Sequence, residues 1–62
     1  MKLKLEIEMG NAAFHDGYNG DEIARILHHL ASSFRGINAK RGDDGSLRDY
    51  NGNTVGAWRV QR

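Results

Sequence analysis

Residues 47–60, LRDYNGNTVGAWRV, predict a β-hairpin. Asn51 and Gly52 lie between two strand-like runs, and both tolerate the positive φ that tight hairpin turns need. The second half of the chain therefore supplies two neighbouring antiparallel strands.

The register of this hairpin depends on Gly56. Val55 differs in parity from Trp58 and Val60, so a regular strand cannot turn all three side chains to one face. An isolated glycine in a strand often marks a β-bulge, whose extra residue reverses the parity. With a bulge there, the core-facing residues would be Leu47, Val55, Trp58 and Val60. Without it, Trp58 lies on the open face beside charged residues and contributes to a binding surface.

Residues 2–9 alternate strictly between apolar and charged side chains, which predicts a strand with one buried face. The apolar face consists of Leu3, Leu5, Ile7 and Met9. The outward row consists of Lys2, Lys4, Glu6 and Glu8, so it runs from basic to acidic. Residues 10–20 read as a glycine-rich loop, in which Phe14 is expected to pack against the core.

Residues 21–35 have the three-and-four spacing of an amphipathic helix. The predicted apolar stripe is Ile23, Ile26, Leu27, Leu30 and Phe34. Gly36, just past the last turn, predicts the stop. The expected order is strand, helix, strand, strand, in a single α+β domain over 1–62: a three-stranded sheet with one helix on one face. A right-handed crossover would follow if the first strand lay parallel to a neighbour.

Composition excludes several classes of protein. The 62 residues contain no cysteine, which excludes disulfides and cysteine-based zinc sites. Nine Lys and Arg against eight Asp and Glu argue against a strongly basic nucleic-acid coat protein. Neither a membrane span nor a signal peptide is visible, so we expect a cytoplasmic protein.

The sequence shows no pattern typical of a catalytic or metal-binding site. His28 and His29 are adjacent, so on a helix they point about 100° apart and cannot chelate one ion together. The serines lack a nucleophile elbow, and so short a chain leaves little volume for a substrate pocket. We therefore expect no metal, no other cofactor and no enzymatic activity.

Nucleic-acid binding is a more serious possibility. Residues 36–62 hold five basic and three acidic side chains, and aromatic residues lie among the basic ones. Arginines beside aromatic rings on an open sheet can stack bases. The candidate residues for nucleic-acid or partner binding are Arg48, Tyr50, Trp58, Arg59 and Arg62.

Three stretches, GNAAFHDG, DEIARILHHLA and LRDYNGNTVGAW, resemble a family of very small proteins encoded on bacteriophages, prophages and plasmids. The hairpin string is the most specific of the three. The resemblance implies the fold and a mobile-element origin, but no catalytic residue. The residues it implies as fold-forming are Phe14, Ile23, Ile26, Leu27, Leu47, Asn51, Gly52 and Gly56.

Small phage proteins often occupy a surface of a host machine, so the resemblance implies an inhibitor that acts by protein–protein binding. One form is an anti-CRISPR protein that blocks a host CRISPR effector, sterically or by presenting carboxylates where phosphates belong. The acidic candidates for partner binding are Glu6, Glu8, Asp16, Asp21, Glu22, Asp43 and Asp44. The chain is expected to be a monomer, or a homodimer formed through an exposed sheet edge.

Overall fold

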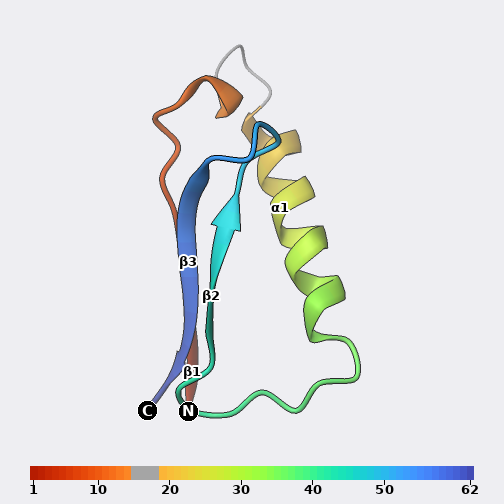
Figure 1. Ribbon diagram of the computed structural model, residues 1–62, viewed down its shortest axis with the longest axis vertical. Helices are drawn as coiled ribbons and strands as arrows, with labels where there is room; N and C mark the ends of the chain where they lie inside the picture. The colour runs from red at the N-terminus through yellow and green to blue at the C-terminus, as the bar shows by residue number, and fades with distance from the viewer. Residues whose placement is uncertain (15–18) are drawn as a thin grey trace.

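The computed structural model describes residues 1–14 and 19–62 and has the predicted two-layer α+β architecture (Figure 1). Its elements are β1 (Lys2–Ile7), the 3₁₀ helix η1 (Ala12–Phe14), α1 (Asn19–Phe34), β2 (Asp44–Arg48) and β3 (Thr54–Gln61). Within the described ranges, no helix is long and apolar enough to cross a membrane.

The sheet has the order β1-β3-β2, and both strand pairs are antiparallel. The last strand therefore lies in the centre, and β1 and β2 form the edges. Since β1 runs antiparallel to β3, the sheet contains no parallel crossover. Lys2 pairs with Gln61, which brings the two chain ends together at one end of the sheet, called here the terminal end (Figure 1).

Of the two registers that the sequence leaves open, the hairpin has the one with a bulge. Leu47 pairs with Gly56, but Arg48 pairs with Thr54, so Val55 is the extra residue on β3. Val55 is consequently buried in the core although its parity is opposite to that of the buried Val60. At Gly56, a β-carbon would collide with the backbone of β1, so this position requires glycine.

Trp58 lies on the helix side of the sheet, as the bulged register predicts. Its ring meets the Phe34 ring edge-on, with centroids 4.8 Å apart and an interplanar angle of 65°. The indole also lies across Gly45 of β2, where a β-carbon would collide with it. Trp58 is half-buried and joins the end of α1 to the sheet.

The core lies at the opposite end, called the hairpin end, where the β2–β3 turn, η1 and the start of α1 meet (Figure 1). Its buried members are Ala13, Phe14, Ile26, Leu30, Leu47 and Val55. The predicted packing of Phe14 is confirmed. Asn11 caps the start of η1. Its side-chain oxygen accepts a hydrogen bond from Ala13 N, and its carbonyl accepts one from Phe14 N.

Three predictions of burial are wrong in the N-terminal segment. Leu3 is 54% exposed, Leu5 is 38% exposed and Met9 is also exposed. The reason is that α1 packs against η1 and β2, so the apolar face of β1 is left largely uncovered.

Helix α1 differs from its prediction in two respects. It starts two residues earlier, at Asn19. Leu27 is exposed, because the buried residues of the helix are spaced by four and form a narrower stripe: Glu22, Ile26 and Leu30. The predicted stop is confirmed, since α1 ends at Phe34 and Gly36 has a φ of 78°.

Candidate functional site

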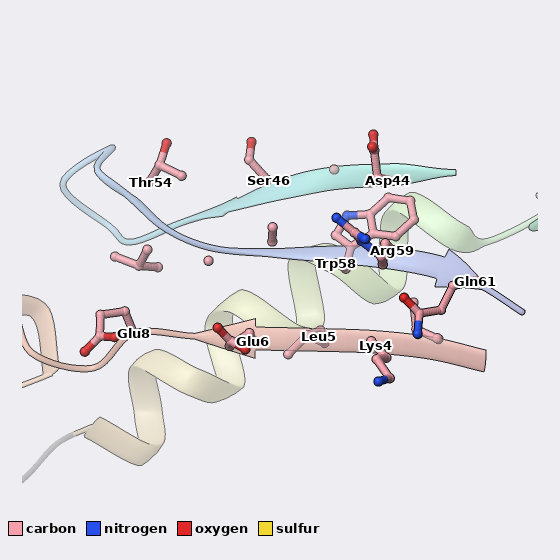
Figure 2. A pocket seen from close by; sticks show the side chains of 15 residues that line it. Lys4, Leu5, Glu6, Glu8, Asp44, Ser46, Thr54, Trp58, Arg59 and Gln61 are labelled. Atoms are coloured by element: carbon pink, nitrogen blue, oxygen red, sulfur yellow. The ribbon is translucent and has the colours of Figure 1, made fainter. Parts of the chain in front are cut away.

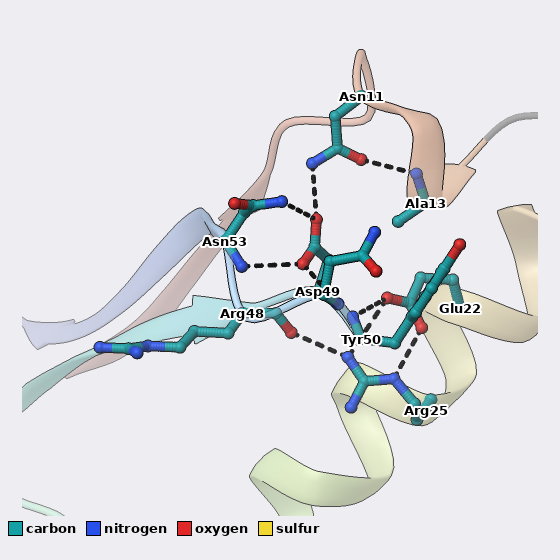
Figure 3. A network of polar contacts seen from close by, with 9 residues as sticks. Asn11, Ala13, Glu22, Arg25, Arg48, Asp49, Tyr50 and Asn53 are labelled. Atoms are coloured by element: carbon teal, nitrogen blue, oxygen red, sulfur yellow. Dashed lines mark hydrogen bonds and ion pairs between the residues drawn. The ribbon is translucent and has the colours of Figure 1, made fainter.

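Two polar regions are candidates for function, and the first is a buried network at the hairpin end (Figure 3). Asp49, only 4% exposed, accepts hydrogen bonds at one oxygen from the backbone N–H groups of Asn51 and Asn53, both at 2.9 Å. Its other oxygen accepts from the side-chain amides of Asn11, at 2.7 Å, and Asn53, at 3.2 Å. Asp49 therefore fixes the hairpin turn and ties it to the segment before η1.

Glu22 provides the second half of this network. The carboxylate is 6% exposed and receives two bonds from the Arg25 guanidinium, at 2.6 and 3.2 Å. It also accepts a 2.7 Å bond from the backbone N–H of Tyr50, while Arg25 donates to the carbonyl of Arg48 at 2.9 Å. The start of α1 is thus bonded to the backbone on either side of Asp49, where β2 leads into the hairpin turn. The side chains Asn11, Glu22, Arg25, Asp49 and Asn53 are called the hairpin network below.

Both carboxylates of the hairpin network stay charged. The hydrogen bond from Arg25 is the main cause that lowers the pKa of Glu22, and it prevails over the opposing effect of burial. For Asp49, burial is the largest single effect and raises the pKa. The hydrogen bonds from Asn53, Asn11 and Asn51 together exceed it, and the pKa of Asp49 ends below its ordinary value.

The hairpin network is a structural element because its groups bind one another. In the described part of the chain, no buried side-chain nitrogen or oxygen lacks a hydrogen-bond partner. Glu22, one of the acidic residues predicted to bind a partner, is buried, and Arg25 and Tyr50 occupy its carboxylate. Two local signals point to the network, namely the acid–base spacing of Glu22 and Arg25 and the tendency of Asp to bond the backbone two residues ahead.

The second region is the open face, defined as the sheet surface opposite α1 (Figure 2). Two rows of paired residues cross it. One row is Lys4, Arg59 and Asp44, and the other is Glu6, Ala57 and Ser46. Because Ala57 and Ser46 are small, the middle of the face is a shallow hollow between longer side chains.

The structure brings together only some of the acidic candidates. Glu6, Glu8 and Asp44 are exposed and line the hollow of the open face. Asp21 is exposed in the first turn of α1, away from this hollow. Asp43 is half-buried in the loop before β2 and accepts a hydrogen bond from Lys40 N at 3.0 Å. Asp16 lies outside the described residues.

The candidates for nucleic-acid binding are divided between surfaces. Trp58 points to the helix side of the sheet, whereas its neighbour Arg59 points to the open face. Arg48 and the exposed Tyr50 lie at the hairpin end. Arg59 and Arg62 instead line a second hollow at the terminal end, together with Arg41, which comes from the loop before β2.

Metal-binding geometry is not seen in residues 1–14 and 19–62, where no group of three His, Asp or Glu could hold an ion. His28 and His29 are both exposed on α1, and His15 lies outside these ranges. The hydroxyls of Ser32 and Ser33 donate to the carbonyls of His28 and His29, one helical turn back.

Comparison of the chain with protein-family models, curated protein sequences and solved structures found no match. The resemblance to phage-, prophage- and plasmid-encoded proteins therefore remains a prediction from the sequence. The chain's own surfaces are the basis on which its function can be inferred.

Proposed function

We propose that the chain is a small binding protein that inhibits a host protein through contact with its open face. One observation supports this most: Glu6, Glu8 and Asp44 are exposed around a hollow that has only Ala57 and Ser46 at its centre. These carboxylates are free of the hairpin network, so they are available to a partner. The hollow has room for a protruding side chain of that partner.

Three carboxylates line the hollow together with two basic side chains, Lys4 and Arg59, and the carboxylates suggest the kind of partner. Exposed carboxylates attract the Lys and Arg side chains with which nucleases and surveillance complexes hold phosphates. A protein that occupies those side chains excludes the nucleic acid both electrostatically and sterically. Together with the resemblance to phage proteins, this favours a CRISPR effector of the bacterial host as the target.

The proposal can be tested by filling the hollow. Tagged wild-type protein should capture a host defence complex and should protect phage from CRISPR targeting. Ala57→Tyr should abolish both effects, and it should preserve folding because tyrosine is well suited to an exposed strand position. The matched control is Ala31→Tyr, on the exposed side of α1, which should retain both effects. Failure of the wild-type protein in both assays, or full activity of Ala57→Tyr, would refute the proposal.

A second candidate function, binding of nucleic-acid phosphates, is favoured by the hollow that Arg41, Arg59 and Arg62 share at the terminal end. Such binding weakens steeply as salt rises, because each neutralised phosphate releases counterions. Titration of DNA and RNA at roughly 50 mM salt tests it, since phosphate contacts are strong at low ionic strength. Arg59→Gln should reduce both the affinity and its salt dependence, and no binding by wild type under these conditions would eliminate this candidate.

A further inference from the structure

The outer edge of β1 offers a row of backbone groups for pairing. Among residues 1–14 and 19–62, β1 has a strand neighbour, β3, on one side only. The Glu8 N–H donates to the Val55 carbonyl, which places the backbone groups of even-numbered residues of this strand on the β3 side. The N–H and C=O groups of Leu3, Leu5 and Ile7 therefore point to the outer edge.

The same strand has an exposed apolar face. Of the seven large hydrophobic residues that are exposed in the described ranges, four belong to residues 1–9: Met1, Leu3, Leu5 and Met9. Leu3 and Leu5 belong to β1 and lie on the face that α1 leaves uncovered, and Met1 and Met9 flank the strand. An edge strand with an uncovered apolar face and no proline is a site for strand pairing.

The charge pattern of β1 indicates which strand could pair with it. Its open-face row, which Glu8 continues just past the end of the strand, reads Lys2, Lys4, Glu6, Glu8 and is basic at one end and acidic at the other. When two copies of such a strand run antiparallel, the basic half of each faces the acidic half of the other. The strand is therefore complementary in charge to itself.

We propose that β1 pairs antiparallel with β1 of a second copy, about a two-fold axis at Leu5, and joins the two sheets into one. The facing pairs, with one residue from each copy, are Lys2 with Glu8, Lys4 with Glu6, Leu3 with Ile7, and Leu5 with Leu5. The odd-numbered pairs exchange backbone hydrogen bonds, and their side chains cover each other on the helix side. The Lys–Glu pairs are the closer, non-hydrogen-bonded kind, in which opposite charges stabilise the pairing most directly.

Neighbouring registers are less favourable. A shift that centres the axis on Lys4 places two lysines opposite each other, and one that centres it on Glu6 does the same with two glutamates. A register that pairs odd-numbered residues of one copy with even-numbered residues of the other would place apolar side chains opposite charged ones. The register centred on Leu5 avoids both faults.

The first test is the mass of the wild-type protein by sedimentation equilibrium over a range of concentrations. A dimer should form reversibly. A wild-type chain that stays monomeric up to about 1 mM, the range of a very weak complex, would overturn the proposal.

A charge exchange tests the register itself. Lys4→Glu places like charges opposite each other twice in the symmetric dimer, and Glu6→Lys does the same with positive charges. Each variant alone should dimerise about tenfold more weakly than wild type or worse. An equimolar mixture of the two variants should regain dimerisation, because the acidic row of one then faces the basic row of the other.

The control is Asp44→Lys, which alters the open face at the opposite edge of the sheet and should leave the dimer unchanged. Trp58 fluorescence verifies that each variant is folded. Unchanged dimerisation of Lys4→Glu, or a mixture that stays monomeric, would overturn the proposed pairing. In the dimer, Glu6 and Glu8 face lysines of the second copy, so a host protein that binds these carboxylates would compete with dimerisation. The mass measurements are made on the protein alone and do not depend on that binding, which Ala57→Tyr tests separately.

Discussion

The two ends of the sheet differ in how they are held. At the hairpin end, Phe14, Leu47 and Val55 are buried, and the hairpin network bonds the turn to α1 and to the segment before η1. At the terminal end, Val60 of the central strand is buried, but Leu3 and Leu5 of the edge strand β1 remain exposed although they alternate as core residues should. Alternation thus leads to burial where η1 and α1 cover the sheet and to an uncovered apolar face along β1.

A small domain can therefore concentrate its stability in one region. A chain of this length buries too little surface to cover both ends, so its one helix covers the end where η1 and the hairpin also contribute. The terminal end is then available for association with another molecule.

The largest effect should come from truncating the same residue type at both ends. Leu47→Ala should lower the free energy of unfolding by about 2 to 5 kcal/mol, because a cavity replaces buried methyl groups. Leu3→Ala should change it by less than about 0.5 kcal/mol at concentrations where the protein is monomeric. Urea denaturation followed by Trp58 fluorescence measures both. Equal losses at the two positions would contradict the contrast between the ends.

A smaller effect is expected from the hairpin network. Glu22→Ala should cost about 1 to 3 kcal/mol of unfolding free energy, because the Tyr50 N–H loses its acceptor and Arg25 loses its partner. Asp44→Ala, which removes an exposed carboxylate at the terminal end, should have little effect. The same urea titration tests the pair, and a loss for Asp44→Ala as large as that for Glu22→Ala would count against a special role of the network.

The smallest and most gradual effect should be the response to acid. Folding lowers the pKa values of Glu22 and Asp49 below their ordinary values of 4.5 and 3.8. Their contribution to stability is therefore complete above these ordinary values and is lost as the pH falls through the lower pKa values of the folded state. Urea midpoints measured from pH 7 to roughly pH 2 should show the decline, and Asp49→Asn should flatten it. An equally steep decline in Asp49→Asn would show that other groups cause it.

The sequence predicted those parts of the fold that depend on short-range patterns. Asn51-Gly52 predicted the hairpin and Gly36 the end of α1, and both glycines have positive φ angles, 87° at Gly52 and 78° at Gly36. The opposite parity of Val55 and Val60 left two registers open, and the structure has the one with a bulge beside Gly56. In each case the signal and its structural effect lie within a few residues, so a local rule is sufficient.

Contacts between distant residues could not be predicted in this way. Asn11 bonds to Asp49, 38 positions away, and Glu22 bonds to Tyr50, 28 positions away. The periodicity of the sequence does not indicate either contact. Alternation predicts which side chains of β1 share a face but not how far a helix extends over them. For this reason the predicted burial of Leu5 is wrong. Of the open face, the sequence predicted only the charged row of residues 2–8. Ala57 and Ser46 lie beside this row because β3 is the central strand, and the sequence did not predict that strand order.

The strand order has a consequence for the sequence of events in folding. Residues 2–7 pair with residues 56–61, so β1 is synthesised before the other two strands and its neighbour in the sheet, β3, after them. The hairpin needs only nearby residues and can close early, whereas β1 must wait for a contact of high sequence separation. During that interval, β1 is an unpaired, alternating strand, and nascent chains on one messenger would expose it to each other.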